Sequence, residues 1–487
     1  MNNKLHIAVL GSDSDHCSEN AKKLAKEVGT EIAKAGAILV TGGGEGVMKY
    51  ASLGAQERGG MVIGILPGAD KRKANEYCNI IIPTEIGFAR GQVIANTADA
   101  AIVIEGGFGT RNEVGETYWR LIPTIALAQS GGTAQEIANT YLDKRKLIKT
   151  YSGETPSIAV EQALRLGQNR LDLQTRLQEV NLDLSLYRTV PSKFIRINPR
   201  NPIDITELER KLSKDYDVKT EFKPAGFRGI RGIYESSNSN IGGTINGRKN
   251  ELFMKHYFIQ DLASVVAVSA LEMFRDAPPY SYLELGAAPG FKTILVHDKL
   301  EGKVNITVVD NHPRRFEQMT RFFQDYGVPA TAHLKDGTTF CRGKYEKVLV
   351  DAPCSGEGMI VKFDSELQQD VGGINKVLEY SKEDIAKFAE VQLKLLQNGF
   401  NCIENGSTVR LVYVTCALNK EENDAVVERF LEKNPSAGLM DIDLETIEMY
   451  HGNPYTEFEY TKVGVRIRPG KTKGLYFTKI CQKERSR

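Results

Sequence analysis

Leu-Glu-Leu-Gly-Ala-Ala-Pro-Gly-Phe-Lys-Thr, residues 283–293, is the stretch that decides the fold of the C-terminal half of this chain. An apolar strand runs here into a turn of small residues and then into a helix. Small side chains let a ligand approach the backbone, and the first turn of a helix offers free N–H groups. In open α/β sheets, ligands bind at the carboxyl ends of the strands. A glycine-rich turn is weak evidence by itself, so the interpretation depends on the segments that follow.

Polar residues end the four apolar segments that follow this turn. The predicted strands of the region are 281–285, 305–309, 331–334, 347–350, 408–414 and 475–481. The polar residues at their ends are Asp310, Asp336, Asp351 with Cys354, and Cys416. Taken singly, each acid could be a helix cap or a loop residue. Because the carboxyl ends of parallel strands meet at one sheet edge, four such ends in succession favour a single site there.

Residues 1–167 show a second alternation of apolar strands and helices. We predict strands over 5–10, 37–40, 61–65, 100–104 and 122–127. This alternation predicts a parallel sheet that helices cover on both faces. Glycine-rich turns follow three of the strands, at Gly11-Ser12, at Gly42 to Gly44 and at Gly106 to Thr110. Glycines permit the close approach of a phosphate, so these turns could face one crevice.

Two segments connect these units. Residues 168–186 are polar with leucines at helical spacing, and we interpret them as a linker helix without chemistry. The next segment, 187–256, predicts a strand at 194–198, a helix at 205–212, a strand at 218–222 and loops over 226–250. Between Tyr187 and Gln260 there are 14 Lys and Arg against 8 Asp and Glu. That surplus could form a phosphate-contacting face or an ordinary solvated surface.

The predicted fold class is therefore α/β, with two doubly wound Rossmann-like units, 1–167 and 257–487, joined by the helical linker and a small α+β subdomain. Of the 487 residues, 41% are hydrophobic and 26% are charged, and the mean hydropathy is -0.31, which is typical of a globular protein. We expect no membrane partner and no secretory leader, because no long apolar run occurs. Seven scattered cysteines without a Cys-x-x-Cys pair disfavour a metal site and indicate a reducing cytoplasm. A net charge of +1 does not by itself indicate a nucleic-acid partner.

Four motifs occur in order along the C-terminal half. They are Gly-Ala-Ala-Pro-Gly-Phe-Lys-Thr at 286–293, Asp-Asn-His-Pro-Arg-Arg at 310–315, Asp-Ala-Pro-Cys-Ser-Gly-Glu-Gly at 351–358, and Thr-Cys followed by Glu-Glu-Asn within 415–423. In this order they resemble the Sun-type (nucleolar proliferation antigen) RNA cytosine-5 methyltransferase family. The resemblance begins near Pro191, where the basic stretch resembles the small RNA-binding subdomain of that family. It therefore implies an RNA-binding role for residues 187–256.

The resemblance implies methyl transfer from S-adenosylmethionine to carbon 5 of a cytosine in rRNA or tRNA. Its implied cofactor site consists of Gly286, Ala287, Ala288, Pro289, Gly290, Phe291, Lys292 and Arg315, with Asp310 at the ribose, Asp336 near the adenine and Asp351 between cofactor and cytosine. Lys292 could otherwise be a plain helix-surface lysine. Carbon 5 of cytosine is a poor nucleophile, and addition of a thiolate to carbon 6 activates it. A carboxyl group near N3 would stabilise the charge that develops there.

Two cysteines, Cys354 and Cys416, compete for the role of nucleophile. Pro353-Cys354 resembles the nucleophile position of DNA cytosine-5 methyltransferases, whereas the RNA family carries its nucleophile in the Thr-Cys motif. The resemblance therefore assigns the nucleophile to Cys416 and release of the product to Cys354. The remaining cysteines are interpreted as small buried apolar residues, and they are Cys17, Cys78, Cys341, Cys402 and Cys481. The chain departs from the family pattern at Ala417, where a hydroxyl residue is common, and at Phe291, where a small residue is common.

Gly-Gly-Phe-Gly-Thr-Arg-Asn-Glu, residues 106–113, resembles the Lonely Guy family of nucleoside-monophosphate phosphoribohydrolases. Residues 81–100 are closer to relatives of that family, among them molybdenum-cofactor carrier proteins. The resemblance implies a nucleotide ligand held by Gly43, Arg90, Gly106, Gly107, Gly109, Thr110 and Glu113, with Arg90 and Glu113 acting on the N-glycosidic bond. Glu105 replaces the usual proline, and its charge should weaken anion binding.

We therefore favour a nucleotide-binding module over an active hydrolase in the N-terminal region, with a structural fusion partner as the third option. For the whole chain, the alternative to an RNA-modifying enzyme is a catalytically silent protein that binds RNA or a nucleotide.

Overall fold

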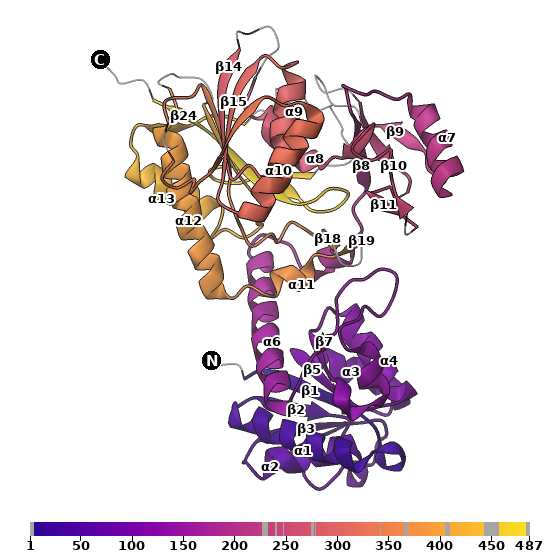
Figure 1. The fold of residues 1–487 in the computed structure, drawn as a ribbon. Helices are drawn as coiled ribbons and strands as arrows, with labels where there is room; N and C mark the ends of the chain where they lie inside the picture. Colours follow the sequence, from indigo (N-terminus) through magenta and orange to yellow (C-terminus); the bar gives the residue numbers. More distant parts are fainter. Residues whose placement is uncertain are drawn as a thin grey trace. The chain divides into compact units, whose positions relative to one another are not determined.

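A computed structural model describes residues 4–225, 232–238, 241–246, 248–273, 277, 279–340, 342–364, 369–404, 410–442 and 457–483. The chain divides into two compact units (Figure 1). Unit 1 comprises residues 1–178 with 371–382, and unit 2 comprises residues 179–370 with 383–487. A short segment from the C-terminal half thus belongs to the N-terminal unit.

Unit 1 contains a seven-stranded parallel sheet in the order β4-β3-β2-β1-β5-β6-β7. The strands are β1 (His6–Gly11), β2 (Ile38–Thr41), β3 (Met61–Leu66), β4 (Ile80–Pro83), β5 (Ala100–Ile104), β6 (Thr124–Leu127) and β7 (Tyr151–Ser152). The doubly wound fold predicted for this region is confirmed. The prediction misses only the two edge strands, β4 and β7, which are short and half exposed and so carry a weak apolar pattern.

Helices cover both faces of this sheet, and each face has its own apolar layer. One face carries α1 (Glu19–Lys34), α2 (Val47–Gln56) and α6 (Pro156–Gln178). The other face carries α3 (Arg90–Thr97), α4 (Phe108–Trp119) and α5 (Gly132–Ile137). Because every strand of the core is covered twice, β1 and β5 are buried along almost their whole length. The glycine-rich turns that follow β1, β2 and β5 remain at the open edge.

Helix α6 is longer than the predicted linker helix and begins earlier. It runs without interruption from Pro156 to Gln178, so the predicted boundary at residue 167 falls inside it. Its first half packs on the sheet through Ala159, Val160 and Ala163, which explains why the chain does not break there. The predicted segment 168–186 is therefore the second half of α6 followed by a loop and the 3-10 turn Leu184–Arg188.

The segment 371–382, which the sequence analysis places within the C-terminal domain, packs on unit 1. The N–H of Gly372 donates to the carbonyl of Lys146 at 2.8 Å, and the Nδ2 of Asn169 donates to the carbonyl of Leu378 at 2.9 Å. The Oδ1 of Asn375 accepts the N–H of Lys149 at 3.0 Å. These bonds join positions more than 200 residues apart, which local sequence patterns cannot reveal.

The main sheet of unit 2 has the order β16-β15-β14-β17-β20-β24-β23-β22, with β21 pairing to β24. Its parallel part is β14 (Tyr280–Leu285), β15 (Val304–Asp310), β16 (Ala330–Leu334), β17 (Lys347–Asp351) and β20 (Leu411–Thr415). Its antiparallel part is β21 (Ala437–Leu439), β22 (Glu457–Tyr460), β23 (Val465–Arg468) and β24 (Leu475–Gln482). The second predicted Rossmann-like unit is thus confirmed. The segment 405–409, where the predicted strand 408–414 begins, lies outside the described residues.

Helices again lie on both faces of this sheet. The helices α8 (Leu262–Ser269), α9 (Phe291–Lys299) and α10 (Pro313–Tyr326) share one apolar layer with the strands. The helices α12 (Lys382–Asn401) and α13 (Asp424–Lys433) share the other. The carboxyl ends of β14, β15, β17 and β20 all meet at one edge, as the sequence predicts.

A small antiparallel sheet in the order β13-β8-β10-β9 forms the α+β part of unit 2. Its strands are β8 (Lys193–Ile197), β9 (Phe222–Pro224), β10 (Ile233–Ser236) and β13 (Tyr257–Ile259), beside helix α7 (Ile205–Tyr216). The predicted strand 218–222 is wrong, because pairing begins only at Phe222, and β10 lies where loops were predicted. The sheet also continues past residue 256 into β13, so a domain boundary at 256 would cut it.

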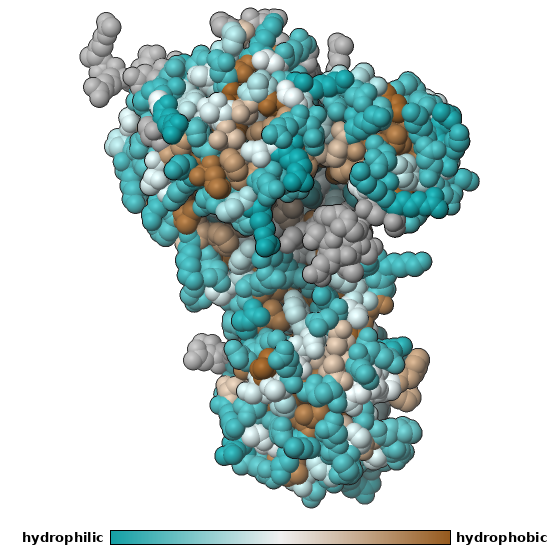
Figure 2. Space-filling model, in the orientation of Figure 1, coloured by the Kyte–Doolittle hydropathy of each residue, from teal (hydrophilic) through white to brown (hydrophobic). Residues whose placement is uncertain are grey.

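The face in Figure 2 is mostly hydrophilic, and its apolar residues lie in small separate patches. None of the helices that the structure describes combines the length and the apolar character that crossing a membrane requires. Nor do the described His, Cys, Asp and Glu side chains gather into a group that could hold a metal ion.

Candidate functional site

The glycine turn after β14 is shaped by two glycines with left-handed backbone conformation. Gly286 has φ +79° and Gly290 has φ +97°. A Cβ atom on Gly286 would lie 2.2 Å from the carbonyl oxygen of Asp351, which belongs to the backbone and cannot move aside. Only glycine therefore fits where this turn passes the end of β17.

Asp310, at the end of β15, is held against this turn. Its Oδ2 accepts the N–H of Ala288 at 3.0 Å and its Oδ1 accepts the N–H of His312 at 2.9 Å. The residue is 6% exposed. A carboxylate offers about four acceptor positions, so these bonds leave lone pairs for two ribose hydroxyls. Asp310 and the glycine turn therefore fit a cofactor that carries a ribose.

The other predicted cofactor residues differ in their surroundings. Arg315, in the first turn of α10, donates to the carbonyl of Ala288 and so braces the turn. Phe291 packs against Phe258 and Phe322, with ring centroids 6.2 and 5.5 Å away, so its bulk is accommodated in an aromatic cluster. Asp336 is exposed and accepts the N–H of Thr338 at 2.8 Å, which is the geometry of a loop aspartate.

Lys292 is paired with Asp351. Its Nζ lies 2.6 Å from the Oδ2 of Asp351, and the two side chains are only 16% and 24% exposed. Burial works to lower the pKa of Lys292, but the neighbouring Asp351 carboxylate outweighs burial and raises it. Lys292 is thus an ammonium ion aimed at Asp351 and not a surface lysine.

Beneath this pair lies Glu284, which the sequence analysis does not single out. It is fully buried within β14 and accepts the hydroxyls of Tyr282 at 2.8 Å and Thr293 at 2.6 Å. Burial raises its pKa to about 7. A glutamate between two leucines of a buried strand is the sequence signal for such a residue.

The two cysteines lie side by side at the ends of β17 and β20. Their Sγ atoms are 2.8 Å apart, and the N–H of Cys416 lies 3.3 Å from the Sγ of Cys354. Contact with Cys416 and burial raise the pKa of Cys354 well above its ordinary value. Cys354 therefore keeps its proton at neutral pH.

Ala417, which departs from the family pattern, is fully buried beside Cys416. Its N–H lies 3.3 Å from the Oγ1 of Thr415, and its carbonyl accepts the Nδ2 of Asn423 at 3.1 Å. The hydroxyl of Thr415 itself donates to the Oδ1 of Asn423 at 2.6 Å.

The other described cysteines differ in how deeply they are buried. Cys402 and Cys481 are buried, while Cys17 and Cys78 are only partly buried. Cys341 lies outside the described residues.

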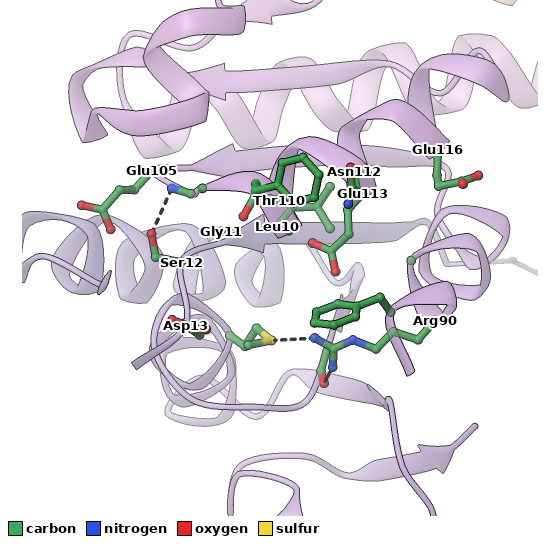
Figure 3. Close-up of a pocket in the computed structure, with 18 of the residues that line it drawn as sticks. Leu10, Gly11, Ser12, Asp13, Arg90, Glu105, Thr110, Asn112, Glu113 and Glu116 are labelled. Carbon is green, nitrogen blue, oxygen red and sulfur yellow. Dashed lines mark hydrogen bonds between the residues drawn. The ribbon is translucent and has the colours of Figure 1, made fainter. Parts of the chain in front are cut away.

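Unit 1 contains a cavity of about 500 Å³ at the carboxyl edge of its sheet. The turns after β1 and β5, the start of α3 and the start of α4 surround it (Figure 3). The predicted residues that line it are Arg90, Gly106, Gly107, Gly109, Thr110 and Glu113. The lining includes Gly42 rather than the predicted Gly43, which turns toward Leu66. The first N–H groups of α4 face this edge of the sheet, where anions bind favourably.

Arg90 and Glu113 point to the same part of the cavity (Figure 3). Arg90 donates to the carbonyls of Gly42 and Ile65, the latter at 3.2 Å. Burial lowers the pKa of Arg90 and raises that of Glu113 to about 7, and their mutual attraction only partly offsets this. Glu113 is thus close to half protonated at neutral pH, which suits a group that exchanges a proton with a ligand.

The side chain of Glu105 does not point toward Arg90 and Glu113. It lies at the opposite end of the cavity and is turned away from Arg90 and Glu113 (Figure 3). Its Oε2 accepts the N–H of Ser18 at 3.2 Å, at the N-terminus of α1. A helix N-terminus stabilises a carboxylate, so the charge of Glu105 is partly neutralised there. The expected weakening of anion binding is correspondingly smaller.

Comparisons with known proteins divide the chain in the same way. Residues 4–155 match the SLOG cluster4 family, and residues 275–480 match the family of 16S rRNA methyltransferase RsmB/F. A probable ribosomal RNA small subunit methyltransferase B of Bacillus subtilis (strain 168) is 30% identical over 217 residues, 42% of this chain and 43% of that protein.

The N-terminal unit has relatives of its own. An uncharacterized protein of Archaeoglobus fulgidus is 38% identical over 110 residues, 23% of this chain and 71% of that protein. A molybdenum cofactor carrier protein of Chlamydomonas reinhardtii is 30% identical and is covered over 98% of its length, against 34% of this chain, with a TM-score of 0.30. In contrast, this chain spans 43% of the length of the Bacillus subtilis methyltransferase and 39% of that of a ribosomal RNA small subunit methyltransferase F of Pectobacterium carotovorum.

Proposed function

Because residues 4–155 belong to the SLOG cluster4 family and residues 275–480 to the 16S rRNA methyltransferase RsmB/F family, we propose that unit 2 methylates carbon 5 of a cytosine in RNA. The observation that carries this proposal is the pair of cysteines whose Sγ atoms lie 2.8 Å apart, at the ends of adjacent strands. One thiol can add to a cytosine while the other remains available for the release of the product. The ion pair of Lys292 with Asp351 lies at the end of the same strand as Cys354.

In the proposed reaction the thiolate of Cys416 adds to carbon 6 of the cytosine, and carbon 5 becomes nucleophilic. S-adenosylmethionine, when bound, supplies the electrophilic methyl group that carbon 5 takes up. Asp351, which is held by Lys292, is the carboxyl group that we propose lies near N3, where it would stabilise the charge that develops. A base then removes the proton of carbon 5, the bond between Cys416 and carbon 6 breaks, and Cys416 leaves as the thiolate, a release that we propose Cys354 assists.

The residues around the glycine turn fit this cofactor. Asp310 keeps acceptor positions for the ribose, and Gly286 keeps the turn free of a side chain. Arg315 braces the turn through the carbonyl of Ala288. Asp336 stays a proposed contact of the adenine, since its carboxylate is exposed at the end of β16.

The proposed RNA partner is rRNA or tRNA, and the small sheet supports this through its exposed cations. The exposed basic residues of this subdomain include Arg200, Arg210, Lys214, Lys219, Lys223, Arg248 and Lys249. Arg196 is different, because it is 3% exposed and lies 2.9 Å from Asp298. It therefore attaches the small sheet to the methyltransferase core and is not available to phosphates.

A labelled methyl donor tests the proposal. Wild-type protein should transfer label to total rRNA or tRNA from cells without the gene, and Cys416→Ala should not. The Cys354→Ala variant should remain covalently attached to RNA on a denaturing gel, because release is impaired. Equal inactivity of wild type and Cys416→Ala on all RNA would support a catalytically silent binding protein instead.

For unit 1 we propose a nucleotide-binding module, favoured by the cavity of about 500 Å³ at the start of α4. The alternative is a phosphoribohydrolase in which Arg90 and Glu113 act on the N-glycosidic bond. The position of both residues in the lining of the cavity supports this alternative. Incubation with the common nucleoside monophosphates separates the two proposals. Release of free base that depends on Glu113 supports the hydrolase, and binding without release supports the module.

A further inference from the structure

Two glutamates follow the two cysteines closely in the sequence of unit 2. Glu357 follows Cys354 by three residues, and Glu422 follows Cys416 by six. Both glutamates are fully buried. Neither belongs to the reacting groups proposed above, although Glu422 is part of the Glu-Glu-Asn motif. Buried carboxylates are costly, so their contacts require an explanation.

Each carboxylate binds the loop that carries the other cysteine. The Oε2 of Glu357 accepts the backbone N–H of Leu418 at 3.3 Å and that of Asn419 at 3.0 Å, in the loop after Cys416. The Oε1 of Glu422 accepts the backbone N–H of Ser355 at 2.9 Å, directly after Cys354. The two loops are thus tied together in both directions.

Two side-chain amides complete this network. The Nδ2 of Asn419 lies 3.0 Å from Glu357 and 2.8 Å from Glu422, so it bridges the two carboxylates. Gln392, on α12, donates its Nε2 to Glu422 and to the carbonyl of Pro353, both at 2.9 Å. The helix behind the sheet therefore supports the residue before Cys354 as well.

The described donors to Glu422 are all uncharged: a backbone amide, a hydroxyl and two side-chain amides. Burial raises the pKa of Glu422 to about 7, and the nearby charge of Glu357 adds to this. Glu422 therefore carries a proton part of the time at neutral pH, which limits the repulsion between the two acids.

We infer that Glu357 and Glu422 are positioning residues for methyl transfer, Glu357 holding the loop of Cys416 and Glu422 holding the loop of Cys354. The inference rests on the proposed function of unit 2. A displacement of about 1 Å in a reacting group can lower a rate by about 100-fold, and each loop would gain that freedom if its carboxylate were removed. The two residues should affect different steps, because the cysteines they hold act at different steps.

The test measures methyl transfer and the covalent RNA adduct with full-length protein. Glu422→Ala should slow release, so that kcat falls about 100-fold while adduct accumulates, as in Cys354→Ala. Glu357→Ala should slow addition, so that kcat falls by about the same factor while little adduct forms. The KM for S-adenosylmethionine should change less than about two-fold in both variants, because neither residue touches the cofactor turn.

Matched variants separate positioning from loss of folding. Glu422→Gln and Glu357→Gln keep most of the hydrogen bonds and should restore kcat to within about 10-fold of wild type. Glu346→Ala removes a carboxylate that accepts the N–H of Ser281 at 2.9 Å, at the opposite edge of the sheet, and should leave kcat unchanged. If both alanine variants show wild-type rates, or lose addition and release alike without rescue by glutamine, the inference is overturned. Absence of methylation and adduct in the wild type and in Cys354→Ala would instead overturn the proposed function.

Discussion

In unit 1 the turns after β1 and β5 surround a cavity of about 500 Å³, whereas in unit 2 the ends of β14, β17 and β20 carry polar side chains that contact one another. Both sites lie at the carboxyl edge of a parallel sheet. In unit 1 Arg90 donates to backbone carbonyls and leaves the space before Glu113 open. In unit 2 Lys292 pairs with Asp351, and Cys354 touches Cys416.

The difference shows that the fold supplies the location and the strand-end residues supply the chemistry. An open cavity with a helix N-terminus suits a ligand that enters and leaves whole. Tightly paired side chains suit a reaction in which groups must be held at fixed distances from one another. Variants in one unit should therefore leave the other unit's activity in place, and the following experiments test this contrast.

The largest effect is expected from Cys416→Ala. Removal of the proposed nucleophile should lower methyl transfer by at least about 1,000-fold, because the activated enamine can no longer form. Binding of adenosine monophosphate to unit 1, measured by calorimetry on the same full-length variant, should be unchanged. A loss of both activities together would contradict the separation of the two sites.

Lys292→Met should lower kcat by roughly 10- to 100-fold, because Asp351 loses the partner that orients it in a partly buried site. The KM for RNA should change less, because Lys292 acts through Asp351 and is not proposed to contact the RNA itself. Steady-state methylation measures both constants. Lys303→Met, at an exposed lysine in the loop after α9, is the control, and a comparable loss in that variant would exclude a role for the pair.

Substitution of one glycine in each site tests how closely the turn there packs against its neighbours. Gly286→Ala should destabilise unit 2 by about 3 kcal/mol, because its Cβ meets backbone at 2.2 Å and its φ is positive. Gly106→Ala should destabilise unit 1 by less, about 2 kcal/mol. Its Cβ would meet the side chain of Thr110 at 2.6 Å, and a side chain can move aside more easily than backbone. Hydrogen exchange resolved by unit measures each cost.

The controls for this pair are Gly302→Ala in unit 2 and Gly36→Ala in unit 1. Both glycines have positive φ, but an added Cβ meets nothing closer than 3.5 Å at Gly302 and nothing within 4 Å at Gly36. Each control substitution should lower the stability of its unit by about 1 kcal/mol. If the controls cost as much as Gly286→Ala, the close approach of the turn to β17 is not what requires glycine.

The last effect concerns how the stability of unit 1 depends on pH. Folding raises the pKa of Glu113 from 4.5 to about 7, so its favourable contribution to stability is complete below pH 4.5 and is lost as the pH rises through 7. Glu113→Gln removes this titration, so the Tm of the variant relative to wild type should rise by roughly 5–10 °C between pH 5 and pH 8. Thermal unfolding at both pH values measures the gain, and Glu161→Gln on the exposed side of α6 should show none.

The sequence predicts the local elements of both units well, because strands and helices follow from the spacing of apolar residues. The strand that ends at Asp310, the glycine turn at Gly286 and the helix after it all lie where the sequence predicts them. The failures occur where burial is incomplete or pairing is distant. The edge strand β4 is half exposed, and β10 lies in a segment rich in glycine and serine.

The sequence by itself determined the two Rossmann-like units, the order of the motifs and the candidate reactive residues, because these depend on residue type and local spacing. Only the tertiary structure decided which of these residues meet. It places Lys292 beside Asp351. It also lets Glu357 bond the loop after Cys416 and Glu422 bond the loop after Cys354. It also added residues 371–382 to unit 1. Such contacts join residues far apart in the chain, and they depend on strand order and side-chain packing that no local pattern encodes.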